Sequence, residues 1–174
     1  MQGQLFTQDF LTRGIIDTPP HQDLTDTAFA AFQATLQGIF KGLDGASTIN
    51  EAQTEQEVIN KVLVALGWGD GTLPQVNLSG KRREDVPDVL LFANAEAKAA
   101  AMPLKDDQRY RHGIALLEAK RWLRPLDRGD SAEATDPDAP SSQMLRYLSR
   151  ADVVSDRAVK WGMLTNGAVD SSSG

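Results

Sequence analysis

The sequence is best read outward from Ile114–Lys120, which reads IALLEAK, an apolar run that ends in two opposite charges. In a β-strand, residues i and i+2 point to the same face, so Glu118 and Lys120 would project together from the end of the strand. Burying a charge is costly unless the charge is paired or holds a metal ion. The stretch therefore predicts a buried strand whose end carries functional side chains.

A second apolar run precedes this stretch and opens with a carboxylate. Residues Pro87–Phe92 read PDVLLF, which predicts another buried strand beginning near Asp88. Upstream, Gln75–Leu78 alternates as a short strand does, and Ser79–Lys81 is typical of a hairpin turn. Residues 93–112 are alanine-rich and then charged, which predicts a short helix or loop inserted between the two buried strands.

Two amphipathic helices are predicted before these strands. Apolar residues recur at helical spacing over residues 26–40, which indicates a helix that packs on the core or on a neighbouring domain. A second helix is predicted over residues 50–66 and stops at Gly67–Trp68. Its start has two candidate capping boxes, and its buried stripe is expected to comprise five apolar residues. The boxes pair Asn50 with Gln53 or Thr54 with Glu57, and the stripe is Val58, Ile59, Val62, Leu63 and Leu66.

Two acidic residues continue the buried stripe of this second helix toward its N-terminus. Glu55 lies one turn before Ile59, and Glu51 lies a turn earlier with fewer apolar neighbours. Either carboxylate could face the ends of the strands. Glu55 is the first choice and Glu51 the alternative.

One further helix and one further strand are predicted toward the C-terminus. The acidic residues 125–141, rich in Pro and Ser, indicate an exposed loop, after which a helix begins at Ser141 or Ser142. The apolar Val159–Leu164 predicts the last strand, and the following Asn166–Gly167 is a strong hairpin signal.

This order of helix, three strands, helix and strand predicts an α/β fold, a mixed β-sheet flanked by helices on both faces. We expect residues 1–45 to form an N-terminal helical arm, in which Pro19–Pro20 breaks a short helix. Residues 46–167 would form the domain itself. Residues 168–174 are expected to be a truncated or artificial tail.

Composition limits the classes of function. The 174 residues include no cysteine, which excludes a disulfide framework and a thiolate metal site, and no apolar run or N-terminal signal indicates a membrane or export. A cytoplasmic location is expected. The net charge of −6 argues against a broad nucleic-acid surface, because such binding draws its affinity from basic residues. Basic residues are nevertheless clustered at Lys81–Arg83, Arg109–Arg111 and Lys120–Arg128.

Four of the charged residues suit metal-dependent chemistry on a phosphodiester. Asp88 and Glu118, on neighbouring strands, could hold one Mg²⁺, an ion that prefers a few carboxylate oxygens and keeps several waters. Lys120 could orient the attacking water or offset charge on the phosphate, and Glu55 would add an outer acidic group. Each residue has an ordinary alternative as a surface ion pair or a helix-dipole partner. His21 and His112 are expected at the surface and not as bases.

Pro87–Asp88 followed by Glu118–Ala119–Lys120, after a helix with an acidic residue, resembles the PD-(D/E)xK nuclease superfamily. Downstream, Gln143 and Tyr147 match the Q-x-x-x-Y motif of its RecB-like branch and of type I restriction subunits. Residues 50–167 are most similar to the N-terminal nuclease region of fused restriction–methylation enzymes, the type IIG class. Beyond the strand and helix motifs, that likeness includes Trp161–Gly167.

The resemblance implies a restriction-endonuclease-like fold and Mg²⁺-dependent cleavage of double-stranded DNA, with Mn²⁺ able to replace Mg²⁺. It also implies that Gln143 and Tyr147 contact the substrate, although Tyr147 could equally be a half-buried packing residue. A methyltransferase domain, binding S-adenosylmethionine, and a target-recognition domain are expected elsewhere in a longer chain. No methyltransferase motif occurs in these 174 residues, and the spacing from Asp88 to Glu118 is long for the family.

Two other functions remain open at this point. The nuclease-like fold could serve as a non-catalytic DNA-docking or interaction module, because a fold alone does not determine function. Alternatively, the domain could belong to a helicase-linked defence or repair nuclease.

Overall fold

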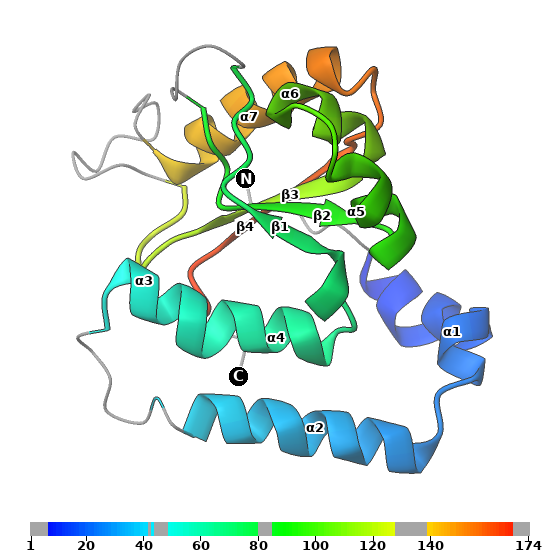
Figure 1. Ribbon diagram of the computed structural model, residues 1–174. Coiled ribbons are helices and arrows are strands. Elements are labelled where there is room, and N and C mark those ends of the chain that lie inside the picture. Colours follow the sequence, from blue (N-terminus) through cyan, green and yellow to red (C-terminus); the bar gives the residue numbers. More distant parts are fainter. Residues whose placement is uncertain (1–6, 42, 44–48, 80–84, 128–138, 169–174) are drawn as a thin grey trace.

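The computed structural model of the protein describes residues 7–41, 43, 49–79, 85–127 and 139–168. Its centre is a four-stranded sheet in the order β1-β2-β3-β4 (Figure 1). The first three strands run antiparallel, and β4 runs parallel to β3, so the predicted α/β class with a mixed sheet is confirmed. The strands are β1 (Thr72–Pro74), β2 (Val89–Phe92), β3 (Gly113–Ala119) and β4 (Trp161–Thr165).

Helices cover both faces of the sheet (Figure 1). One face carries α5, α6 and α7, and the other carries a helix formed by α3, the π-helical turn η3 and α4. The bounds are α5 (Ala95–Ala101), α6 (Asp106–Arg109), α7 (Pro140–Val154), α3 (Glu51–Thr54), η3 (Glu55–Ile59) and α4 (Asn60–Ala65), with short 3₁₀ turns η4 (Gly69–Gly71) and η5 (Tyr110–His112).

The two buried strands contribute to a separate hydrophobic cluster on each face. Leu90 and Leu116 pack under α7, whereas Leu91 and Leu117 pack against α4. Because both faces are covered, β2 and β3 read as continuous apolar runs and not as an alternating pattern. Glu118 and Lys120 share the face of Leu116 by the two-residue period of the strand, and so point to the α7 side.

The N-terminal residues form short helical turns and one long helix. The turns η1 (Phe10–Gly14) and η2 (Ile15–Asp17) precede α1 (Pro19–Gln22), and α2 spans Asp26–Lys41 as predicted. Pro19 starts α1, because proline fits the first position of a helix and pushes the residue before it into an extended conformation. α4 lies between α2 and the sheet (Figure 1). Ile39 and Phe40 of α2 pack against the hydrophobic cluster on the α4 face of the sheet.

The helix predicted over residues 50–66 is confirmed, with one correction to its predicted buried stripe. Its start is the Asn50–Gln53 capping box, with bonds of 2.9 and 3.0 Å, and not the Thr54–Glu57 alternative. Its end is a Schellman motif, in which the N–H groups of Gly67 and Trp68 donate to Val64 and Leu63. Leu66 was expected in the buried stripe and is instead 54% exposed, because α4 ends at Ala65.

The strand predicted at Gln75–Leu78 is wrong, because the strand lies three residues earlier, at β1. Gln75 has a positive φ of 51°, which interrupts the regular ladder. Pairing with the segment before β2 nevertheless continues irregularly. The N–H of Gln75 donates to Asp88 O, and the N–H of Leu78 donates to Asp85 O, both at 2.9 Å. Of the hairpin turn predicted at Ser79–Lys81, residues 80 and 81 lie outside the described residues.

The remaining predictions about elements are confirmed in outline. Residues 93–112 form α5, α6 and η5, and the last strand is β4. α7 begins at Pro140 after Ala139, earlier than the predicted Ser141 or Ser142, because proline can occupy the first helical position. Most of the loop predicted over 125–141 and most of the tail predicted at 168–174 lie outside the described residues. No helix within the described ranges has the length and apolarity needed to span a bilayer.

Candidate active site

Asp88 and Glu118 meet where β3 ends beside the start of β2. The antiparallel register pairs Val89 with Leu117, which places the next residues, Asp88 and Glu118, opposite each other. Asp88 Oδ2 accepts a hydrogen bond of 2.7 Å from the N–H of Ala119, and Glu118 Oε2 accepts one of 3.4 Å from the N–H of Asp88. The two carboxylates are thus held by backbone groups of each other's strands.

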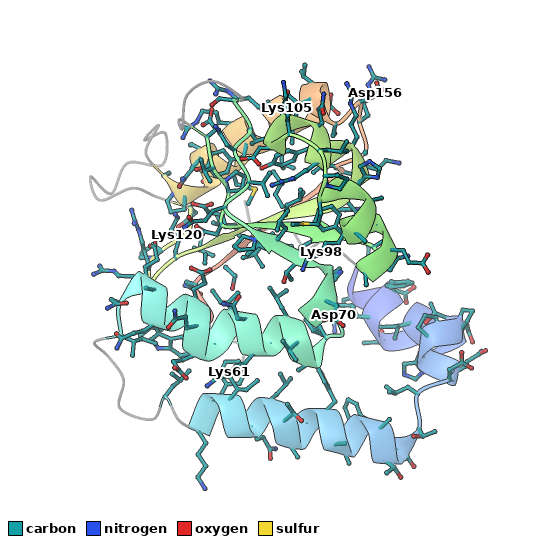
Figure 2. All side chains as sticks on the ribbon, viewed as in Figure 1. Lys61, Asp70, Lys98, Lys105, Lys120 and Asp156 are labelled. Carbon is teal, nitrogen blue, oxygen red and sulfur yellow. The ribbon has the colours of Figure 1, made fainter. Side chains whose placement is uncertain are left out.

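Lys120 completes this group from the residue after β3. Its Nζ lies 2.6 Å from Glu118 Oε1, and the exposed fractions of the two side chains are 8% and 4%. Its N–H donates to Thr165 O, which extends the pairing of β3 with β4 by one residue. Figure 2 shows Lys120 at the end of the sheet that faces α3. The predicted common orientation of Glu118 and Lys120 is confirmed.

Burial raises the pKa values of both strand carboxylates. For Asp88, burial is the largest cause, the Ala119 hydrogen bond and the charge of Lys120 only partly offset it, and the charge of Glu51 raises the pKa further. For Glu118, burial again comes first, and the charge of Asp88 adds to it while Lys120 opposes both. The site therefore holds more negative charge than its single lysine neutralises.

Glu55, the acidic residue predicted to face the strand ends, lies at the π-helical turn. In η3 the N–H of Asn60 donates to Glu55 O, five residues back, and such turns occur often at functional sites. Glu55 is half-buried, and its pKa is raised by burial, then by the charges of Asp88 and Glu51. Glu51 is exposed. Glu55, the first choice from the sequence, is therefore the more enclosed of the two acids, while the charge of Glu51 also raises the pKa of Asp88.

Gln143 and Tyr147 lie beside the carboxylates on α7. Gln143 Nε2 donates to the Tyr147 hydroxyl oxygen at 2.7 Å, and Tyr147 is only 4% exposed. Burial raises the pKa of Tyr147, and the charges of Glu118 and Asp88 raise it further against the Gln143 hydrogen bond and Arg146. Tyr147 is thus both a buried packing residue and a hydroxyl within electrostatic reach of the site.

Two contacts that the sequence did not suggest hold the segment after Lys120. The buried Thr54 hydroxyl accepts the N–H of Trp122 at 2.9 Å, which joins this segment to the start of the helix. Asn166 Nδ2 donates to Arg124 O at 2.9 Å, which joins it to the end of β4. The partners in these two contacts are separated by 68 and 42 positions in the sequence, so no local pattern could reveal the contacts.

A third unexpected feature is the buried carboxylate of Asp85. It is 2% exposed, and Arg146 and Arg150 of α7 both contact it. The spacing of the two arginines, one helical turn apart, was the only local signal. The two histidines take no part in the contacts described above: His21 is exposed, and His112 is half-buried rather than at the surface as expected.

The residues present fit a hard divalent cation held by two carboxylates. Asp88 and Glu118 offer oxygen donors whose repulsion a cation would relieve, and Mg²⁺ typically binds through one or two carboxylates while keeping water. No grouping of three or more His, Asp or Glu side chains suited to a metal occurs among the described residues. Such an ion would therefore depend on water or substrate for most of its coordination.

The raised pKa values predict how pH and divalent cations affect stability. A carboxyl whose pKa is higher in the folded than in the unfolded state makes the folded state bind more protons, so the free energy of unfolding falls as pH rises through that window. We expect added Mg²⁺ to raise the melting temperature more at about pH 8 than at about pH 5. In Asp88→Asn the difference between the Mg²⁺ effects at the two pH values should be smaller. An equal Mg²⁺ effect at both pH values in the wild type would contradict this prediction.

Comparisons with known proteins give no match. No family model matches the sequence, and neither a curated protein nor a solved structure is similar to it. Its function is therefore inferred from its sequence motifs and from its own geometry, in which a buried and a half-buried carboxylate lie with one lysine at the end of a mixed sheet.

Proposed function

We propose that the domain is a Mg²⁺-dependent endonuclease that hydrolyses phosphodiester bonds of double-stranded DNA. The observation that supports this most is the meeting of Asp88, Glu118 and Lys120 through hydrogen bonds of 2.6 to 3.4 Å at the ends of neighbouring strands. Burying Glu118 and Lys120 beside the half-buried Asp88 lowers stability relative to an apolar core, and a chemical role explains why these residues are there.

In this proposal Asp88 and Glu118 hold the cation, which Mn²⁺ could replace. The bound ion would supply positive charge at the scissile phosphate. Lys120, held at Glu118, would donate to a phosphate oxygen or to the attacking water. Glu55, with its raised pKa, would accept a proton at the edge of the site.

Gln143 and Tyr147 would contact the DNA strand. The Tyr147 oxygen already accepts the Gln143 amide hydrogen, so its own O–H is directed to another acceptor, such as a phosphate oxygen. Because the pKa of Tyr147 is raised, the hydroxyl stays protonated and remains a donor.

The wider assignment follows from the sequence resemblance. We propose a PD-(D/E)xK nuclease of restriction-endonuclease-like fold, acting as the cleavage module of a type IIG-like restriction–modification protein. Methyltransferase and target-recognition domains would then supply most DNA affinity, because this chain has a net charge of −6. S-adenosylmethionine would bind to those domains.

A second candidate is a non-catalytic DNA-docking or interaction module. It is favoured by the lack, among the described residues, of a third side chain that could complete a metal site. Cation binding separates the two candidates, because only the nuclease needs it.

Calorimetric titration with Mn²⁺ and Mg²⁺ tests the nuclease proposal. We expect the wild-type chain to bind a cation. Asp88→Asn and Glu118→Gln should each weaken cation binding by about tenfold or more, because each removes one of two charged donors. Asp70→Asn is the matched control: Asp70 is exposed and far from Lys120 in Figure 2. A wild-type chain that binds no cation and leaves duplex DNA intact would favour the docking module.

A further inference from the structure

Asp85 and two arginines form a charged cluster next to the proposed site. Asp85 lies three residues before Asp88, and its side chain is 3% exposed. Its Oδ1 accepts a hydrogen bond of 3.1 Å from Arg146 Nε, and Arg150 Nη1 contacts its Oδ2. The cluster thus joins the segment before β2 to α7.

The cluster contains more positive charge than the buried carboxylate requires. One guanidinium is enough to neutralise Asp85, and a buried carboxylate must be neutralised in this way. The second arginine leaves the cluster with a net charge of +1 in a chain whose net charge is −6. The side chains of Arg146 and Arg150 are 48% and 45% exposed, so this charge is accessible to a ligand in solution.

The position of the cluster relates it to the proposed catalytic residues. The Arg146 guanidinium carbon lies 5.7 Å from the centre of the Tyr147 ring, and Tyr147 is hydrogen-bonded to Gln143. Arg150 lies one helical turn further along α7. The two arginines therefore extend the row of polar side chains that begins at Gln143.

We propose that Arg146 and Arg150, held in place by Asp85, form a binding site for a backbone phosphate of the DNA strand that enters the carboxylate site. This rests on the proposed function, since the ligand is the same DNA. The site would position the strand without reading its sequence, as contacts to phosphates do.

The chemistry of the arginines explains why Asp85 matters. A guanidinium has five N–H donors, and the bond from Arg146 to Asp85 uses the Nε–H, leaving the terminal nitrogens to other acceptors. Paired donors of this kind match the oxygens of a phosphate. Because Asp85 already fixes both side chains, little of their conformational freedom remains to be lost when the phosphate binds.

The salt dependence of DNA binding tests this site. Binding of a duplex oligonucleotide would be measured by fluorescence anisotropy in EDTA, so that no cleavage occurs, over a range of salt concentrations. Each phosphate contact contributes a slope of about 0.9 to the plot of log K against log salt. Because the two arginines share one phosphate, we expect Arg146→Gln and Arg150→Gln each to lower the slope, and the double variant to lower it by about 0.9. Arg150→Lys should keep the slope but weaken binding, because the charge remains and the paired donors are lost.

The control is Arg13→Gln, which removes an exposed arginine that also pairs with an acid, Asp9. It should leave the slope unchanged. If Arg150→Gln lowers only the melting temperature and not the slope, the cluster is purely structural and the proposal is wrong. It is equally wrong if the wild-type chain does not bind the duplex at low salt. Because EDTA removes divalent cations, these outcomes are independent of the metal titration that tests the nuclease.

Discussion

Replacing Lys120 by methionine should reduce Mg²⁺-dependent cleavage of duplex DNA by about 10²–10³-fold, the usual effect of removing one donor that stabilises developing charge. Methionine keeps most of the length of the buried side chain and removes only the ammonium group, which lies 2.6 Å from Glu118. The rate would be measured in single turnover with enzyme and Mg²⁺ both saturating, so that weaker binding of DNA or of the cation does not contribute.

The matched control for this variant is Lys61→Met. Lys61 also pairs with a glutamate, Glu57, but both side chains are more than half exposed, and Lys61 lies away from Lys120 in Figure 2. Its cleavage rate should equal that of the wild type. An unchanged rate in Lys120→Met, with normal folding, would remove Lys120 from the mechanism.

Replacing Glu118 by alanine should lower the free energy of unfolding by about 3–5 kcal/mol, the cost of leaving one member of a buried ion pair alone. The Lys120 ammonium would remain in a site where its side chain is 8% exposed, without its hydrogen-bond acceptor. The N–H of Asp88 would lose its acceptor as well. Urea unfolding of the chain measures the change.

A double variant distinguishes the pair from ordinary packing. Glu118→Leu with Lys120→Met replaces both charges by apolar groups and should be more stable than Glu118→Ala, because no buried ammonium is left without its glutamate partner. For comparison, Glu57→Ala removes half of an exposed pair and should cost less than about 1 kcal/mol. A double variant less stable than Glu118→Ala would show that the two charges do not depend on each other.

The main strands could be predicted from the sequence because their burial is a local property. β2 and β3 are covered on both faces, and this appears directly as apolar runs that end at charged residues. β1 could not be placed, because its end is set by the positive φ of Gln75. That conformation goes with a backbone bond from Gln75 to Asp88, a residue that sequence periodicity does not connect to it.

The candidate site was predictable to the extent that it depends on strand ends. Asp88 and Glu118 lie opposite each other because they stand at the ends of two neighbouring strands. Gln143 and Tyr147 lie close together because they are one helical turn apart. Asp85 was missed because its partners are on a helix 61 positions away and it stands in a charged stretch that reads as a surface turn. Its burial depends on how α7 packs, which no single segment encodes.

The π-helical turn Glu55–Ile59 gives its helix one residue more than a regular helix would have over the same turn. Deleting one residue from this turn would therefore restore a regular helix and keep the orientation of Thr54 relative to Leu63, which packs on the sheet. Deleting Lys61 from α4 would instead rotate Thr54 by about 100° relative to Leu63, because each residue of an α-helix turns the chain by that angle. Thr54 would then lose the N–H of Trp122. The segment after Lys120 should thus tolerate the first deletion better than the second.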